Sequence, residues 1–225
     1  MSAPTRLGLV ALGDSITVGE GNMVCGIPCR SWALWLAEAL DLPFTSRAAN
    51  GAVIADVVRD QLPAVRDDYD VGCLYVGAND VRGPGWDPAA YERDLTTVVT
   101  GLAERCTRTL LLTLPSDLGR PPALDKPAQA SAIVRRIARS SGVAIGELDD
   151  LAGWTLILPD VVHPTALGQL EIADRAAAAL GAAHRPSDLA GGIALGPRGR
   201  ASYGRAHLRL LARDVVRRRV EAARA

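Results

Sequence analysis

Apolar and polar positions along this chain follow two different spacings, which predict strands alternating with helices. Runs of consecutive apolar residues, typical of strands buried on both faces of a sheet, alternate with segments whose apolar residues recur every three or four positions. The expected strands are 7–12, 44–48, 71–76, 109–114 and 143–148. The expected helices are 31–40, 54–65, 88–105, 127–140 and 164–180. This alternation predicts an α/β domain with a parallel sheet.

The first expected strand ends in Gly13-Asp14-Ser15, where the chain should turn into a helix. A serine there can be a nucleophile if the protein also supplies a base, a group that orients the base, and donors for an oxyanion. Of the three histidines, only His163 follows an aspartate at helical spacing, in Asp160-Val-Val-His163. An aspartate on one ring nitrogen leaves the other free to accept the serine proton. Ser15, Asp160 and His163 therefore form a candidate catalytic triad.

Two candidate oxyanion donors lie between the serine and the histidine. Gly51 and Asn79 each follow a segment that is expected to be a strand. Parallel neighbouring strands end at one edge of a sheet, which is where open α/β folds place their sites. We therefore expect Ser15, Gly51, Asn79 and His163 to converge at this edge.

Each of these motifs also has a purely structural interpretation. A serine and an aspartate after a strand often only form a turn and cap a helix. Asp160 and His163 could be a carboxylate and a solvated histidine on the last helix of the domain, and Asn79-Asp80 could be a turn pair. Short motifs gain weight from their context, and four of them in order favour a catalytic site.

The four motifs, in this order, resemble the sequence blocks of the SGNH or GDSL hydrolases, which are named for a serine, a glycine, an asparagine and a histidine. The resemblance spans about residues 6–182. The blocks in this chain are Gly13-Asp14-Ser15, Asn50-Gly51, Gly77-x-Asn79-Asp80 and Asp160-x-x-His163-Pro164.

The resemblance implies a role for each matching residue. Ser15 would be the nucleophile, His163 the base, and Asp160 the residue that orients it. The Ser15 amide, the Gly51 amide and the Asn79 side chain would form the oxyanion hole. The implied fold is a flavodoxin-like three-layer α/β/α sandwich around a parallel five-stranded sheet. The implied chemistry is hydrolysis of an ester or thioester, with no cofactor.

Other catalytic motifs are missing from the sequence. There is no Gly-x-Ser-x-Gly elbow, and the only lysine, Lys126, follows an aspartate, so no Walker-type phosphate loop is possible. Gly19-Glu20-Gly21 does not continue to a dinucleotide-binding motif. Cys25 and Cys29 could form a loop disulfide, but we expect free thiols, and no further His or Cys cluster completes a metal site. We expect neither a metal nor a cofactor.

Substrate contacts are expected from loops above the carboxyl edge of the sheet, at 18–30, 83–87 and 115–126. Proline and glycine fix turn geometry in the last two, so we favour ordinary connections there over a substrate lid. We assign Asp14, Asp80 and Trp86 as candidate substrate contacts, with Trp86 as an aromatic wall for the acyl or alcohol group.

The C-terminal segment differs in charge from the rest of the chain. Residues 185–225 contain ten arginines and three acids, whereas residues 1–184 contain 15 basic and 22 acidic residues, so the net charges are about +7 and −7. We expect a catalytic domain at 1–184 and an extension at 185–225, helical at about 201–223. This helix could bind a membrane surface or nucleic acid, but we favour docking on the domain or on a second subunit, with no nucleic acid partner.

Length and hydropathy fit an enzyme rather than a disordered chain, with 225 residues of which 48% are hydrophobic. No apolar run approaches the roughly 18 residues that a membrane span needs. The first residues leave no room for a signal peptide, which predicts a cytoplasmic protein. The leading hypothesis is a serine hydrolase acting on a small acyl ester or thioester through an acyl-enzyme. The alternative is a scaffolding protein that keeps the fold without the catalysis.

Overall fold

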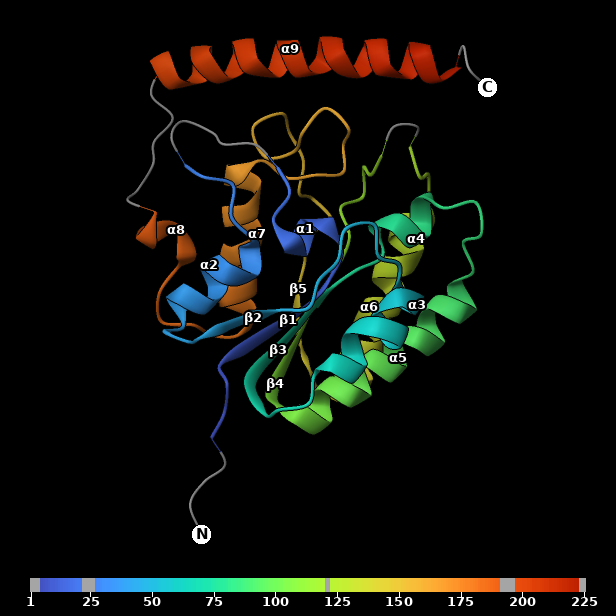
Figure 1. Ribbon diagram of the computed structural model, residues 1–225, viewed down its shortest axis with the longest axis vertical. Coiled ribbons are helices and arrows are strands. Elements are labelled where there is room, and N and C mark those ends of the chain that lie inside the picture. Colours follow the sequence, from blue (N-terminus) through green and yellow to red (C-terminus); the bar gives the residue numbers. More distant parts are fainter. Residues whose placement is uncertain (1–4, 22–26, 120–121, 191–196, 223–225) are drawn as a thin grey trace.

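Five parallel strands form one sheet in the order β2-β1-β3-β4-β5 (Figure 1). The computed structural model describes residues 5–21, 27–119, 122–190 and 197–222. Each expected strand is confirmed, with ends that differ by a few residues. The strands are β1 (Leu9–Gly13), β2 (Phe44–Ser46), β3 (Tyr69–Tyr75), β4 (Cys106–Leu112) and β5 (Ala144–Gly146).

Helices cover both faces of the sheet, which gives the expected three-layer α/β/α sandwich (Figure 1). One face carries α2 (Trp32–Ala39), α7 (Ala166–Ala179) and α8 (Pro186–Leu189). The other face carries α3 (Ile54–Asp56), α5 (Pro88–Arg105) and α6 (Lys126–Ser141). Two short helices, α1 (Ser15–Val18) and α4 (Ala78–Arg82), begin just beyond the carboxyl ends of β1 and β3.

Polar side chains set where two of the longer helices begin. Ser31 accepts a hydrogen bond from the amide of Ala33, and Asp87 accepts from the amides of Ala89 and Ala90. Such caps satisfy amides that have no partner within the first turn of a helix. The predicted helices at 31–40 and 88–105 therefore begin where a cap is present.

The predicted helix at 54–65 is not regular. After α3 the chain widens into a π-helix, η1 (Val57–Gln61), and then tightens into a 3₁₀-helix, η2 (Leu62–Ala64). Pro63 has no amide hydrogen, so it cannot make the hydrogen bond that a regular α-helix requires there. The widened turn carries Gln61, whose buried side chain reaches β1.

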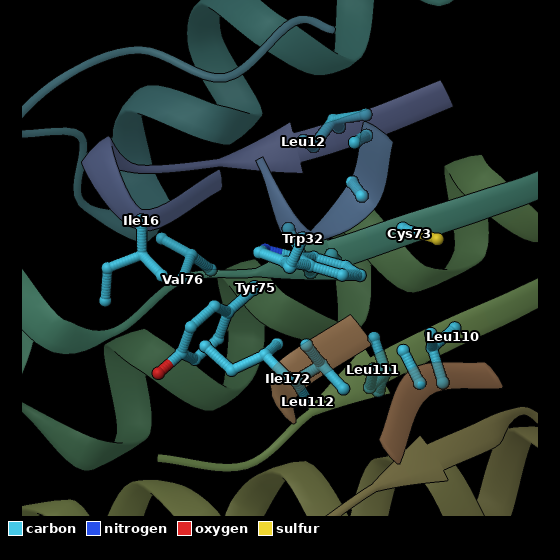
Figure 2. Close-up of a cluster of buried hydrophobic side chains, with 14 of the residues drawn as sticks. Leu12, Ile16, Trp32, Cys73, Tyr75, Val76, Leu110, Leu111, Leu112 and Ile172 are labelled. Atoms are coloured by element: carbon cyan, nitrogen blue, oxygen red, sulfur yellow. The ribbon is translucent and has the colours of Figure 1, made fainter. Parts of the chain in front are cut away.

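The core lies where the central strands meet these helices. Figure 2 shows Leu12, Leu110, Leu111 and Leu112 of the strands together with Trp32 and Ile172 from α2 and α7. Trp32 is fully buried and packs edge-on against Tyr75, with ring centroids 6.4 Å apart. Strands buried on both faces explain why the sequence shows apolar runs rather than alternation.

The C-terminal extension contains α8 and α9 (Pro197–Ala222), and α9 begins four residues before the predicted start. Helix α9 lies across the top of the molecule, above the carboxyl edge of the sheet (Figure 1). Cys25 lies outside the described residues, so its pairing with Cys29 stays untested. None of the helices in the described ranges is both long enough and apolar enough to cross a membrane.

Candidate active site

The candidate site lies at the point where the chain changes direction across the sheet. From β1 the chain proceeds through α2 to β2 on one side, whereas β3 pairs with the other side of β1. Ligand sites of doubly wound sheets form at such a switch point, beyond the carboxyl ends of the strands. Ser15 and Asn79 follow the two strands that flank it.

The turn before Ser15 requires a glycine. Gly13 has a φ of 150°, and a Cβ atom there would lie 2.2 Å from the carbonyl oxygen of Tyr75. Asp14 follows as the N-cap of α1, and its carboxylate accepts a hydrogen bond of 3.0 Å from the amide of Ile16. Ser15 is the first residue of α1 and is 7% exposed. The Gly-Asp-Ser motif is thus a tight turn followed by a cap, and it presents the serine at the sheet edge.

Two buried glutamines hold this turn from opposite faces of the sheet. Gln61 of η1 accepts from the amide of Gly13 and donates to its carbonyl, both at 2.9 Å. Gln169 of α7 donates to the carbonyl of Ile16 at 3.0 Å and accepts from the amide of Trp32 at 2.8 Å. Neither residue could be predicted from the sequence, because a single glutamine within a helix does not indicate which distant residue it contacts.

Ser15, His163 and Asp160 form a continuous hydrogen-bonded chain. Ser15 Oγ lies 2.9 Å from His163 Nε2, and His163 Nδ1 lies 2.6 Å from Asp160 Oδ2. When Nδ1 carries the proton and donates to Asp160, Nε2 is left to accept from the Ser15 hydroxyl. This is the arrangement in which a histidine can take the serine proton.

The segment from Asp160 to His163 is a turn that precedes α7, not part of a helix as its spacing suggested. Asp160 Oδ1 accepts from the amides of Val162 and His163 at 3.0 and 3.1 Å. Aspartate often closes a turn in this way through the amide two residues on. The same carboxyl group therefore shapes the turn with one oxygen and contacts the imidazole with the other.

Neighbouring loops fix this turn further. The amide of Leu158 donates to the carbonyl of His163, and the amide of Gly119 donates to that of Val161, both at 2.8 Å. Val161 has a φ of 56°, in a region that β-branched residues rarely adopt. Such a conformation persists only where the surroundings impose it, so these contacts hold the turn in a strained form.

The electrostatics of the pair favour a charged Asp160 beside a basic imidazole. Burial acts to raise the pKa of Asp160, but hydrogen bonds from His163 and from the Val162 amide outweigh it, and the pKa lies below its ordinary value. The Asp160 hydrogen bond raises the pKa of His163 above its ordinary value, although burial opposes this. Both shifts stabilise the imidazolium that proton transfer from serine would create.

Glu20 is a second carboxylate beside the imidazole, and no motif in the sequence identified it. Its Oε2 lies 3.5 Å from His163 Nε2, on the nitrogen that faces Ser15. Its other oxygen accepts a hydrogen bond from the side chain of Asn50. The charge of Glu20 also raises the pKa of His163. No local pattern could have revealed this contact, because the two residues are brought together only by the fold.

The second and third sequence blocks meet beside the carboxyl edge. The Asn79 side-chain amide donates to the carbonyl of Ala52 at 3.0 Å, next to Gly51. Gly51 is exposed in a turn with a φ of 77°. The structure therefore brings the two candidate oxyanion donors into one neighbourhood, and their convergence with Ser15 stays a prediction.

The carboxyl groups of Asp14 and Asp80, two candidate substrate contacts, have hydrogen-bond partners within the protein. Asp14 is 1% exposed, so a substrate cannot reach its carboxylate, and burial raises its pKa to about 7. Asp80 caps α3 by accepting from the amide of Ile54 at 3.0 Å, and burial raises its pKa to about 6. Asp14 is therefore corrected to a helix cap. A substrate contact for Asp80 stays a prediction, because its carboxyl group accepts from the Ile54 amide but the residue also lines a cavity.

Trp86 borders a cavity of about 290 Å³ that Asn79 and Asp80 also line. Its indole nitrogen donates to Gln129 at 3.1 Å, and its ring lies 5.2 Å from that of Tyr91. These contacts hold the ring at the rim of the cavity, and a substrate contact for Trp86 stays a prediction.

Solved structures of other proteins share this fold. LAE5, an alpha/beta hydrolase enzyme from the metagenome of Lake Arreo, Spain, has a TM-score of 0.64 and 20% sequence identity to this chain, covering 81% of it and 98% of LAE5. Axe2, an acetylxylan esterase from Geobacillus stearothermophilus, has a TM-score of 0.61 and 20% identity, covering 79% of this chain and 97% of Axe2. These likenesses agree with the fold described above. No curated protein matches the chain significantly.

The sequence profile of the GDSL-like Lipase/Acylhydrolase family matches residues 11–170, from β1 into α7. This range contains all four motifs and confirms the resemblance that they suggested. The chain therefore belongs to the GDSL-like lipase/acylhydrolase family.

Proposed function

We propose that this protein hydrolyses a carboxylic ester or a thioester through an acyl-enzyme on Ser15. The observation that carries the proposal is the chain of contacts from Ser15 Oγ through His163 to Asp160, at 2.9 and 2.6 Å. The base is within hydrogen-bonding distance of the nucleophile through one ring nitrogen and of the orienting carboxylate through the other. Membership of an acylhydrolase family supports the same reaction class.

In the first half-reaction, His163 Nε2 accepts the proton of the Ser15 hydroxyl while Oγ attacks the carbonyl carbon. The carbonyl oxygen becomes an oxyanion, for which the Ser15 amide, the Gly51 amide and the Asn79 side chain are the proposed donors. The imidazolium then gives its proton to the leaving oxygen or sulfur, and the bond from the carbonyl carbon to that atom breaks. The acyl group remains on Ser15.

In the second half-reaction, water takes the place of the leaving group. His163 accepts a proton from the water, whose oxygen attacks the acyl carbon. The tetrahedral intermediate collapses, the proton returns to Ser15 Oγ, and the acid is released. Asp160 keeps its negative charge throughout and stabilises the imidazolium in both halves.

Structures of Axe2 offer a parallel for these roles. Variants described as catalytic mutants of that esterase replace a serine, an aspartate and a histidine. In Axe2 the aspartate precedes the histidine by three positions, which is also the spacing of Asp160 and His163. The scaffolding alternative is not favoured, because a protein without catalysis has no need to keep the Ser15, His163 and Asp160 contacts together.

Labelling with a fluorophosphonate, followed by intact and peptide mass spectrometry, tests the proposal without knowledge of the substrate. We expect one adduct on Ser15 in the wild type and none in Ser15→Ala or His163→Ala. Arg59→Ala is a control, because its side chain is exposed and, among the residues that the structure describes, bonds only neighbouring carboxylates. Labelling that persists in Ser15→Ala, or its absence in the folded wild type, would contradict an activated Ser15.

A further inference from the structure

The C-terminal helix contacts the loop that leads to the candidate triad. Tyr203 of α9 is 5% exposed, and its hydroxyl donates to the carbonyl of Trp154 at 2.7 Å. The Tyr203 and Trp154 rings stack with centroids 5.2 Å apart. The His207 ring packs edge-on against Trp154, with centroids 5.7 Å apart. The family match ends at residue 170, so α9 adds these contacts to the part of the chain that the family defines.

A cavity of about 340 Å³ lies beside this aromatic contact. Leu151, Ile157 and Trp154 of the loop line it from one side, and His207 and Leu211 of α9 line it from the other. Its size falls within the range of about 300–1,000 Å³ typical of small-molecule sites. Helix α9 therefore forms part of the wall of this cavity.

The pocket borders the turn that carries Asp160 and His163. Its lining includes Pro159 and Val161, the residues on either side of Asp160. It also includes Leu158, whose amide donates to the carbonyl of His163. A group bound here would lie beside the turn that carries Asp160 and His163, whereas Gly51 and Asn79 come from the loops after β2 and β3.

We propose that this pocket binds the alcohol moiety of the ester, an inference that rests on the proposed function. His163 must protonate the leaving oxygen, so the alcohol lies beside the imidazole when the carbonyl is at Ser15. The pocket beside the turn that carries His163 therefore receives the alcohol rather than the acyl chain. Helix α9 acts as a wall of this subsite.

The lining favours an uncharged, apolar or aromatic alcohol. Leu151, Ile157 and Leu211 offer aliphatic surface, and Trp154 offers an aromatic ring. Burial lowers the pKa of His207, so this imidazole is neutral at neutral pH.

Three esters separate the two sides of the substrate. Ethyl acetate is the reference, benzyl acetate places a phenyl ring on the alcohol, and ethyl phenylacetate places it on the acyl group. The variant is Leu211→Trp, which fills the pocket. The matched control is Leu208→Trp on the same helix, because Leu208 is 65% exposed and does not line the pocket.

We expect Leu211→Trp to lower kcat/KM for benzyl acetate by at least about tenfold, the scale on which apolar pockets discriminate groups of different size. Values for ethyl acetate and ethyl phenylacetate should stay within about twofold of wild type, well below that scale, and Leu208→Trp should leave all three esters unchanged. An equal loss on all esters, a loss confined to ethyl phenylacetate, or no loss would overturn the proposal. Leu211→Phe, a smaller enlargement, serves if the tryptophan variant does not fold.

A binding measurement keeps this proposal separate from the proposed function. Benzyl alcohol is titrated into Ser15→Ala while the Trp154 indole signal is followed by NMR. A saturable shift that Leu211→Trp removes supports the pocket even if the wild type hydrolyses none of the three esters, an outcome that would count against the proposed function alone. The absence of a saturable shift in Ser15→Ala would overturn the pocket.

Discussion

The contact of Gln61 with Gly13 gives the sharpest quantitative prediction. Gln61→Leu keeps a side chain of similar size in the core but removes both hydrogen bonds to Gly13. The carbonyl of Gly13 keeps one partner, because it also accepts from the amide of Ala49 at 3.1 Å. The amide of Gly13 loses the partner that the Gln61 side chain provides. The two groups of Gly13 are therefore affected unequally.

The magnitude follows from this inequality. A buried amide left without a partner costs about 1–3 kcal/mol, and the loss of one bond at a carbonyl that keeps another costs about 0.5–1.5 kcal/mol. We expect Gln61→Leu to lower the free energy of unfolding by about 2–4 kcal/mol. Because Gly13 precedes Ser15 by two residues, we also expect kcat to fall by at least about tenfold, since misplacement by about 1 Å can cost about a hundredfold.

Urea unfolding and steady-state kinetics on an ester that the wild type cleaves measure the two effects. Asp60→Ala is the control, because Asp60 is exposed on the same π-helix and its side chain bonds only Arg59 within the described part of the chain. Its effect should stay within about 0.5 kcal/mol. A Gln61→Leu protein as stable as this control would refute the energetic argument. A destabilised protein with unchanged kcat would refute the view that Gln61 positions the nucleophile.

Three further predictions concern charge and hydrogen bonding at the site. Activity should rise with pH as His163 becomes neutral, with a midpoint above the ordinary value of about 6.5 because its pKa is raised; Glu20→Gln should move this limb to lower pH, and an unchanged pH profile would contradict the contact. Burial raises the pKa of Asp14 from 3.8 to about 7, so the folded state holds its proton more tightly than the unfolded state, and stability should fall by up to about 4 kcal/mol as pH rises from about 4 to 7. Asp14→Asn, which keeps an oxygen for the Ile16 amide, should flatten that dependence in urea unfolding at pH 5 and 8, and an identical slope in both proteins would count against a buried neutral carboxyl group. Asn79→Ala should lower kcat by roughly 100- to 1,000-fold if its amide binds the oxyanion, whereas a slight change would assign it only to the contact with Ala52.

Local patterns predicted the parts of the fold that local forces determine. The apolar runs of β1, β3 and β4 gave the sheet, because strands buried on both faces need no polar positions. The helix at 88–105 was predicted to its exact bounds, since its cap and first proline lie in the sequence itself. The helix at 54–65 was predicted as regular. It is irregular in the structure, where Pro63 lacks the amide hydrogen that a regular α-helix requires.

The candidate site divides in the same way. Ser15, Asp160 and His163 could be paired from the sequence because a motif and a three-residue spacing identify them. Glu20 and Gln61 could not, because each contacts a partner that is distant in the chain. Asp14 was misassigned because burial of its carboxyl group depends on how the sheet edge packs, which no spacing reports.

The outward face of α9 has a consequence for how this protein meets charged surfaces. Arg205, Arg209 and Arg213 are exposed along the helix, while the whole chain has a formal net charge of zero. Charge of one sign gathered on a single edge creates a directional field that a sum over the chain conceals. At low salt both cation exchangers and anion exchangers should retain the protein. The arginines of α9 would face the cation exchanger, and the acidic part of the chain would face the anion exchanger. Retention on both should vanish as salt shortens the Debye length to about 10 Å and below.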